Sequence, residues 1–518
     1  MKPFVILTLL SILNATLCAQ ELLPLKTEKL EGAGVWEDPR IEAFPRNQFR
    51  ITVWFEAQFL GDGKAYLRRT KEFDEMGRNE LREKVIRILK ALSQKSQASV
   101  GESLNELAVR NAISNLEFHW IVNGFSCQIN RDALEEVKKI PGVRMIYFAG
   151  PAETRRNQRP AAKPVASPPK KTEREPFSPE RFKPNWYITA LKADQVWKEH
   201  KIAGEGVLNV IHDGNFILSP SIEATLFRNP NETENGKDDS GNGLINDIHG
   251  YDFSLNRPQL TRMAMPKNSE KVSGSVLHGH QCAAIICGKG TEESPHQFGI
   301  APESQWAGVL ASRRVEAAIE WAIEQGADTY SMSFSRPNLG DMRSHWRKMM
   351  EHGAFCGVHF VSGAGNFAMK GSPSFAPVPV QMRTPEDIPH VVFAAAGIQK
   401  DLSRTPFSSQ GPVLWETAHY KDGLVDKPEV VAFNFRLPQL LPDGSVKEQA
   451  SNGNSFAGPM FCGTIALMLS ANPELKPWEV REIIISTARD VGESGYDHQT
   501  GHGLIDAYAA VSEAINRK

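Results

Sequence analysis

The sequence predicts an α/β protein whose larger, C-terminal part is built on a mostly parallel β-sheet with helices on both faces. Three observations lead to this prediction. From residue 186 to the C-terminus, short apolar segments alternate with helical segments, which is typical of parallel sheets covered on both faces. Residues 49–150 have a separate, smaller α+β pattern. Between these regions, residues 151–184 are rich in Pro, Lys, Arg and Ser and poor in large apolar side chains.

The smaller region has the pattern of two helices packed on a small sheet. Alternating apolar residues predict a strand over residues 49–55, and one-sided apolar residues predict a helix over residues 81–92. Residues 119–129 are expected to form one strand with a glycine interruption. A short helix over residues 132–140 and a last strand over residues 143–148 complete the pattern.

The larger region is expected to supply the sheet. Strands are predicted over residues 207–211, 306–310, 329–334, 355–361 and 391–396, and helices over residues 278–287, 314–325 and 456–469. In such sheets, functional groups gather in the loops that follow the carboxyl ends of the strands.

Length, charge and cysteine content narrow the classes of function. A chain of 518 residues is too long for one ordinary core. A formal net charge of -2 without a sustained basic face argues against a nucleic-acid partner. The six cysteines form neither a disulfide framework nor a CxxC zinc motif. Apart from Cys18, we expect them to be buried, small hydrophobic side chains.

The N-terminal segment has the features of an export signal. Lys2 precedes an apolar stretch over residues 4–13, and the small residues Ala15 and Ala19 follow, so cleavage is expected after residue 19. A membrane anchor is the alternative, but the stretch is shorter than the ~20 residues of a spanning helix. Lipid attachment at Cys18 is disfavoured because the preceding residues form a poor lipobox. We expect a secreted or periplasmic protein without a membrane span.

Residues 151–184 are expected to form an extended linker that proteases can reach. Their basic residues would also suit an anionic partner, but a flexible charged spacer is the commoner use of such a composition. The expected division is therefore a signal peptide (1–19), a small α+β domain (45–150), the linker (151–184) and a large domain (185–518).

Three segments carry side chains suited to nucleophilic catalysis. Ser455 stands directly before an apolar helix, whose N-terminal N–H groups favour developing negative charge. His278 opens another helix and could act as the base for a nearby serine. Asn366 follows a strand in a glycine-rich turn and could donate to an oxyanion. An N-cap serine or a structural histidine would explain either residue alone, but the combination favours a serine hydrolase.

These segments resemble the subtilisin-like serine proteases, or subtilases. Residues 453–459, Gly-Asn-Ser-Phe-Ala-Gly-Pro, are similar to the family's Gly-Thr-Ser-Met-Ala-Ala-Pro around the nucleophile. Residues 278–284 resemble its His-Gly-Thr-His-Val-Ala-Gly, and residues 329–335 resemble its substrate strand Ile-Asn-Met-Ser-Leu-Gly. Further matching segments occur in the family's order at residues 239–250, 299–302, 406–411, 427–429 and 503–506.

The resemblance implies a subtilisin-like fold for the large domain and a serine endopeptidase activity on polypeptide substrates. Ser455 would attack the scissile carbonyl, His278 would act as base and then acid, and Asn366 would hold the oxyanion. The residues implied to bind substrate are Ser333, Phe334, Ser335 and Gly365.

The small domain is similar to the family's inhibitory propeptide, especially at residues 123–125 and 141–143. The resemblance implies a ferredoxin-like fold for this domain. It would help the large domain to fold and would block the cleft until the linker is cut. We expect a monomer that requires no cofactor.

The acidic member of the triad departs from the family pattern. Where the family has Val-Ile-Asp-Thr-Gly, residues 210–214 are Val-Ile-His-Asp-Gly. In ungapped register His212 takes the position of the carboxylate. Neighbouring strand residues face opposite sides, so Asp213 is expected to reach His278 only if the backbone bulges.

This departure leaves an alternative function open, a pseudoprotease that keeps the scaffold for binding peptides or proteins. Loss of the triad carboxylate costs about 10⁴ in turnover. An unrelated α/β hydrolase is less favoured, because residues 453–457 lack the last glycine of Gly-x-Ser-x-Gly.

A calcium site is the one cofactor suggested by residue content. Residues 238–247 carry oxygen ligands at short spacing, but His249 stands where a calcium loop of the EF-hand type has its last glutamate. A polar turn is the better interpretation.

Overall fold

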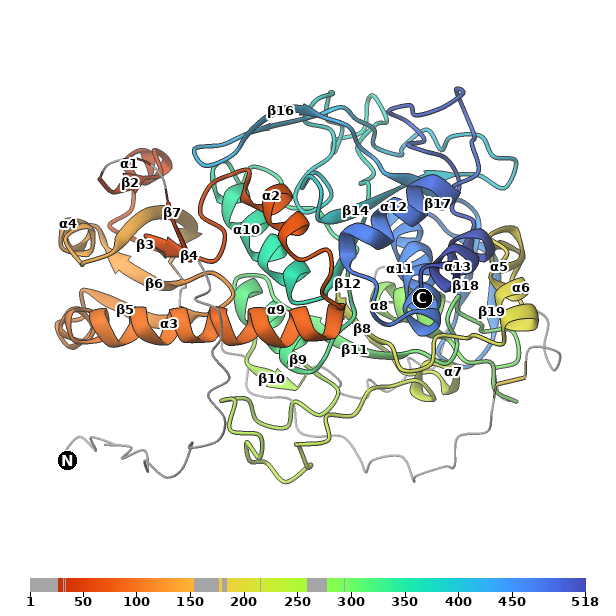
Figure 1. The fold of residues 1–518 in the computed structure, drawn as a ribbon, viewed down its shortest axis with the longest axis horizontal. Coiled ribbons are helices and arrows are strands. Elements are labelled where there is room, and N and C mark those ends of the chain that lie inside the picture. Colours follow the sequence, from red (N-terminus) through yellow and green to blue (C-terminus); the bar gives the residue numbers. More distant parts are fainter. Residues whose placement is uncertain are drawn as a thin grey trace.

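The computed structural model describes residues 27–30, 32, 34–152, 177–178, 184–214, 216–258, 277–292 and 294–518. The expected signal peptide and nearly all of the linker lie outside the described residues. Two domains lie side by side in Figure 1, an N-terminal domain (residues 27–152) and a C-terminal domain (residues 184–518). Among the described residues, we find no helix that combines the length and hydropathy of a membrane span.

An eight-stranded sheet forms the centre of the C-terminal domain. Its strand order is β10-β9-β11-β8-β12-β13-β14-β17, and every neighbouring pair is parallel except β9 and β10. The predicted mostly parallel sheet is thus present. The strands are β8 (Leu208–His212), β9 (Gly250–Asp252), β10 (Arg257–Pro258), β11 (Gln305–Leu310), β12 (Thr329–Met332), β13 (His359–Gly363), β14 (Val392–Ile398) and β17 (Val430–Phe433).

Helices cover both faces of this sheet, and each face has its own apolar core. Val210 packs in one core and its neighbour Ile211 in the other, as the alternation of strand side chains requires. On the face of Ile211 lie α5 (Trp186–Ala190), α6 (Ala193–Gln195), α7 (Pro220–Glu223), α8 (His278–Cys287), α11 (Asn454–Ala471), α12 (Pro477–Thr487) and α13 (Ala507–Asn516). On the other face lie α9 (Val315–Glu324) and α10 (Met342–Phe355).

The N-terminal domain has a five-stranded sheet of order β2-β7-β3-β6-β5. Its helix α3 spans 32 residues and continues well beyond the predicted helix. The elements are β1 (Glu28–Lys29), β2 (Trp36–Glu37), α1 (Arg40–Ala43), β3 (Gln48–Phe55), β4 (Ala57–Gln58), α2 (Ala65–Glu72), α3 (Arg78–Val109), β5 (Ile113–His119), β6 (Gly124–Asn130), α4 (Leu134–Lys138) and β7 (Val143–Pro151).

Two predicted strands were wrong in extent. Residues 119–129 form the end of β5, a turn and most of β6, rather than one strand. Gly124 begins β6 against β3, where a Cβ atom would lie 2.0 Å from the carbonyl oxygen of Val53. Gly124 therefore allows β6 to approach β3 closely, and it does not interrupt a strand. The strand predicted from residue 355 starts only at His359, because Phe355 is still the last residue of α10.

The two domains share a continuous apolar core over α9 and α10. Residues of α2, α3 and β3 belong to the same buried cluster as these two helices. At its centre, the indole N–H of Trp54 donates a buried hydrogen bond to Nδ1 of His345, at 2.8 Å. The carboxylate of Glu320 accepts the backbone N–H of Ile121 at 2.9 Å. The interface thus combines apolar burial with specific polar contacts.

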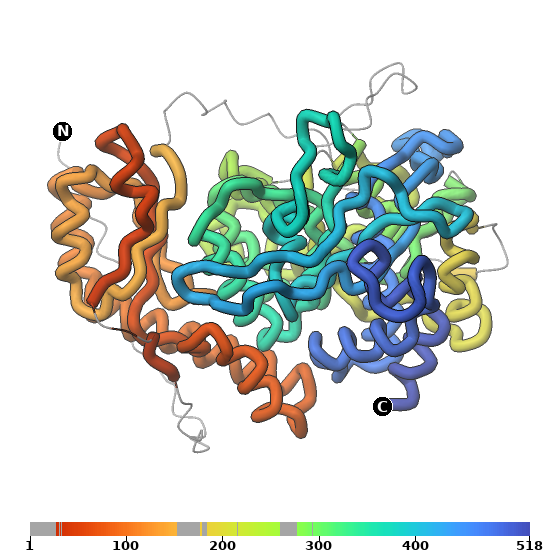
Figure 2. The backbone as a smooth tube through the Cα atoms, turned by 90° about the horizontal axis from the view of Figure 1, so that it is seen from above, coloured from red at the N-terminus to blue at the C-terminus, as the bar shows by residue number. Residues whose placement is uncertain are grey.

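A hairpin of the C-terminal domain extends this contact. Strands β15 (Val413–Glu416) and β16 (Lys421–Val425) form a two-stranded antiparallel sheet that reaches toward the N-terminal domain in Figure 2. The ring of His419, in the turn between them, packs edge-on against Trp54 with centroids 5.3 Å apart. A second hairpin, β18 (Leu437–Leu440) and β19 (Val446–Ser451), leads to α11.

Candidate active site

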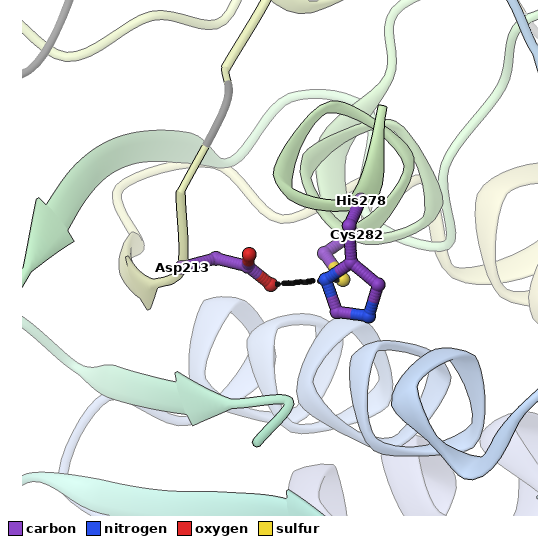
Figure 3. A group of neighbouring side chains, drawn as sticks. All are labelled: Asp213, His278 and Cys282. Carbon is purple, nitrogen blue, oxygen red and sulfur yellow. Dashed lines mark hydrogen bonds and ion pairs between the residues drawn. The ribbon is translucent and has the colours of Figure 1, made fainter. Parts of the chain in front are cut away.

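Asp213 and His278 form a hydrogen-bonded pair at the carboxyl end of β8. Asp213 follows the last residue of this strand, and His278 is the first residue of α8. A carboxylate oxygen of Asp213 lies 2.6 Å from Nδ1 of His278 (Figure 3). A carboxylate can only accept, so Nδ1 carries the proton and Nε2 stays free to accept one.

His212 lies on the opposite side of the sheet and does not stand at the carboxylate position of the triad. Its Nδ1 lies 3.0 Å from the hydroxyl of Tyr330, and its ring contacts Phe334. Burial and the charge of Arg336 lower the pKa of His212 to about 3. The imidazole is therefore a neutral part of the core.

The bulge that we expected in β8 is absent. The pairing of β8 with β11 and β12 continues in regular register through His212. Ordinary strand alternation then sends His212 to one face and Asp213 to the other. Relative to the ungapped comparison with the family's Val-Ile-Asp-Thr-Gly, the carboxylate stands one residue later. Asp213, and not His212, therefore lies beside His278.

Ser455 and Asn366 lie together at the N-terminus of α11. Both line a cavity of about 230 Å³. A Cβ atom on Gly453 would lie 3.6 Å from Nδ2 of Asn366 and 3.8 Å from the backbone nitrogen of Ser455. The amide of Asn366 is oriented by the backbone N–H of Asn454, which donates to its Oδ1 at 2.9 Å. The amide nitrogen of Asn366 and the backbone nitrogen of Ser455 therefore lie near the same point beside the serine.

The two halves of the site meet where α8 lies against α11. The rings of His278 and Phe456 are 5.7 Å apart between centroids, and Figure 3 shows the imidazole projecting from α8 toward the neighbouring helix. In the described structure, the hydroxyl of Ser455 forms no hydrogen bond with His278. Such bonds often form only when substrate is bound.

Cys282 lies beneath both halves. Its sulfur is 3.7 Å from a carboxylate oxygen of Asp213 and 3.6 Å from the carbonyl oxygen of Ser455. The sequence predicted a buried hydrophobic side chain, and all five cysteines among the described residues are indeed buried and free. The sequence did not predict that Cys282 lies at the site. Cys282 is one helical turn after His278, and only the fold shows which side of α8 faces Ser455.

Asp213, His278 and Cys282 are close enough to share a metal ion, since their ligand atoms lie within 4.8 Å of one another. Burial, together with the charge of Asp213, raises the pKa of the Cys282 thiol well above its usual value. In the metal-free site the thiol is therefore protonated, and a metal ion would have to displace that proton. The carboxylate and the imidazole are already bonded to each other, which suits proton transfer better than metal binding.

The polar stretch at residues 238–247 forms a turn. The carboxylate of Asp238 accepts backbone N–H groups of Gly241, Asn242 and Gly243 at 2.7 to 3.2 Å. Asp239 accepts from Asn235. The turn thus supplies donors to Asp238, and the preceding residue Asn235 supplies one to Asp239.

The four residues implied to bind substrate all line the cavity beside Ser455, namely Ser333, Phe334, Ser335 and Gly365. Three further lining residues were missed from the sequence, namely Gly363, Phe367 and Arg383. Gly363 is the last residue of β13, and the other two belong to irregular segments after it, where hydrophobic periodicity gives no signal.

Comparison with known proteins connects this geometry with a family. Residues 253–503 match the model described as the subtilase family. Over 254 residues the chain is 30% identical to a subtilisin of Bacillus pumilus, and the match covers 48% of this chain and 81% of that relative. The chain belongs to the subtilase family. His278, Asn366 and Ser455 lie inside the residues matched by the family model, and Asp213 precedes them.

This subtilase is also similar to longer relatives. It is 24% identical over 335 residues to a probable subtilase-type serine protease of Deinococcus radiodurans, covering 61% of this chain and 41% of the relative. It is 23% identical over 470 residues to bacillopeptidase F of Bacillus subtilis, covering 83% of this chain and 28% of the relative. The subtilase therefore spans less than half the length of these two relatives.

Proposed function

We propose that this protein is an exported serine endopeptidase, made as a self-inhibited precursor. The observation that carries the proposal is the hydrogen bond between Asp213 and His278, located where α8 meets the N-terminus of α11. It supplies an oriented base beside a serine that already has two neighbouring N–H donors. The name of the Deinococcus radiodurans relative, a probable serine protease, agrees with it.

In the proposed reaction, Oγ of Ser455 attacks the scissile carbonyl carbon while Nε2 of His278 takes its proton. Asp213 holds the tautomer and stabilises the imidazolium. Nδ2 of Asn366 and the backbone N–H of Ser455 donate to the oxyanion. His278 then protonates the leaving amine, and a water molecule, deprotonated by the same imidazole, releases the acyl group from Ser455.

The N-terminal domain is proposed to be the inhibitory propeptide. Apart from β4 and α2, which lie between β3 and α3, its elements from β3 onward follow the order β3-α3-β5-β6-α4-β7, and these four strands lie in the order β7-β3-β6-β5. Two helices inserted among four strands in this way are typical of a ferredoxin-like domain. In the proposal, export depends on the signal at residues 1–19, and activation requires a cut in residues 151–184.

The test is self-processing of the purified full chain with and without a fluorophosphonate, which phosphonylates an activated serine. We expect a cut within residues 151–184, prevention of that cut by the reagent, and one modified peptide that contains Ser455. An intact precursor with no label on Ser455 would instead support the pseudoprotease. The hydrogen bond between Asp213 and His278 supports the enzyme over that alternative.

The acid limb of the kcat/KM profile is expected above pH 6.5, the ordinary pKa of histidine. Burial alone would lower the pKa of His278, but the hydrogen bond and the charge of Asp213 outweigh burial and raise it. Because the base must be neutral, activity is lost as the pH falls through this raised pKa. Replacing Asp213 by Asn should move the limb to lower pH. A limb below pH 6.5, or one that the variant leaves in place, contradicts the assignment.

The Asn366→Ala variant is expected to lower kcat by about 10²–10³ with little change in KM, since an oxyanion donor acts mainly in the transition state. The measurement is steady-state hydrolysis of a peptide that the wild type cleaves. Asn452→Ala is a suitable control, because this exposed asparagine precedes α11 outside the cavity. Equal losses in kcat for both variants would remove Asn366 from the proposed oxyanion site.

A further inference from the structure

The cavity beside Ser455 has the position of a side-chain pocket. Its lining includes the segment Ser333, Phe334 and Ser335, which continues from β12, and residues of the glycine-rich turn that ends at Phe367. Ser455 lines the same cavity. In the proposed function, Ser455 attacks the carbonyl carbon of one substrate residue. The side chain of that residue is then the one that is placed to enter the cavity.

Arg383 gives this pocket a positive charge. It lines the cavity, and the other lining residues are serine, phenylalanine, glycine and asparagine. Its guanidinium stacks on the ring of Phe367, 3.7 Å from the centroid, and donates to the carbonyl oxygen of Ser374 at 3.1 Å. Stacking and this bond fix the guanidinium and leave other N–H donors available. Within the described residues, no carboxylate forms an ion pair with it.

The buried acid Glu386, which the backbone of Arg383 contacts, does not cancel this charge. Glu386 is fully buried beside the lining residue Ser335, which donates to its Oε1 at 2.6 Å, and the backbone N–H of Arg383 donates at 3.1 Å. Its Oε2 is buried and has no hydrogen-bond partner among the described residues. Burial raises the pKa of Glu386 to about 8. At neutral pH the carboxyl is therefore mainly uncharged.

We propose that this pocket takes an acidic side chain, so that the enzyme cleaves after glutamate or aspartate, with Arg383 as the specificity-determining residue. A carboxylate that enters the pocket meets a guanidinium whose charge is otherwise unpaired, and charge-assisted hydrogen bonds of this kind are strong. A lysine or arginine side chain would meet a like charge.

The test compares kcat/KM of the full chain on matched peptides that differ only in the residue before the cleaved bond, Glu, Gln, Phe or Lys. We expect Glu to exceed Gln by about tenfold or more and Lys to be the poorest. Arg383→Met should remove the difference between Glu and Gln, and this ratio is not affected by a loss of kcat/KM common to both peptides. Lys370→Met, which removes an exposed charge outside the pocket, should keep the wild-type order.

The inference is overturned if wild type cleaves after Phe but treats Glu and Gln alike, or if Arg383→Met keeps the preference for Glu. Failure to cleave any of the four peptides would count against the proposed function instead. In that case the Ser455→Ala protein, made as the full chain and then cut within residues 151–184 by an added protease that also digests the N-terminal piece, is titrated with peptides whose C-terminal residue is Glu or Gln. Tighter binding of the Glu peptide, lost in a double variant with Arg383→Met, supports the acidic pocket, and equal or absent binding overturns it.

Discussion

The Ser455→Ala variant is expected to lose about 10⁶ in kcat, the loss that follows removal of the nucleophile from a serine triad. The oxyanion donors and the binding cleft remain, so a residual rate of about 10³–10⁴ over the uncatalysed reaction should persist. Because the variant cannot process itself, both proteins are first cut within residues 151–184 by an added protease. Measurements of kcat on a peptide substrate, with wild type as the reference, then give this ratio.

Ser333→Ala is the matched control for this variant. The Ser333 hydroxyl also lies at the cavity, but it donates to the carbonyl oxygen of Ser455 at 2.8 Å and thus positions the backbone. Its removal should cost far less in kcat than removal of the nucleophile. Similar losses for the two serines, or a Ser455→Ala variant within tenfold of wild type, would show that Ser455 does not attack the substrate.

The Asp213→Asn variant is expected to lose about 10⁴ in kcat, because an amide cannot fix the required imidazole tautomer or stabilise its positive charge. The hydrogen bond of 2.6 Å to His278 is the contact that this substitution alters. The steric change is small, so the thermal unfolding temperature should stay close to that of wild type. The measurement is kcat on a fast peptide substrate, with unfolding temperature recorded in parallel.

The neighbouring His212→Phe variant separates the two interpretations of the motif. It removes the hydrogen bond to Tyr330 and leaves an unpaired hydroxyl in the core. We expect a lower free energy of unfolding, by about 1–3 kcal/mol, and a kcat within a few-fold of wild type. If His212→Phe loses activity as Asp213→Asn does while its unfolding temperature is unchanged, the assignment of the carboxylate is wrong.

The bounds of helices could be predicted from the sequence where the pattern of apolar side chains was clear. The helix at residues 278–287 was predicted with the bounds that α8 has, because its apolar, small-residue run ends before Gly288. The extent of α3 was underestimated, since only its first part shows a clear apolar stripe. Its later residues Val100, Leu104 and Leu107 are buried against a different core, that of the N-terminal sheet.

Which residues could form the site was visible from the sequence, but their mutual geometry was not. Ungapped comparison placed His212 at the position of the carboxylate. Because neighbouring strand residues face opposite sides, His212 and Asp213 could not both face His278. Once β8 is known to end at His212, the same rule places Asp213 on the side of His278. Arg383 and Cys282 were missed for another reason. Their contacts join segments far apart in the chain, and no local pattern encodes such contacts.

The apolar core shared by the two domains has a consequence for timing. A single cut in the connecting segment would leave the packing of Trp54 and its neighbours on α10 intact, so the severed piece would stay attached as a separate polypeptide. The newly made enzyme would then become active only when the severed N-terminal domain dissociates or is digested. If the N-terminal domain is the inhibitor that we propose, the delay before activity would be set by how tightly two surfaces hold together, and not by how fast one peptide bond is broken.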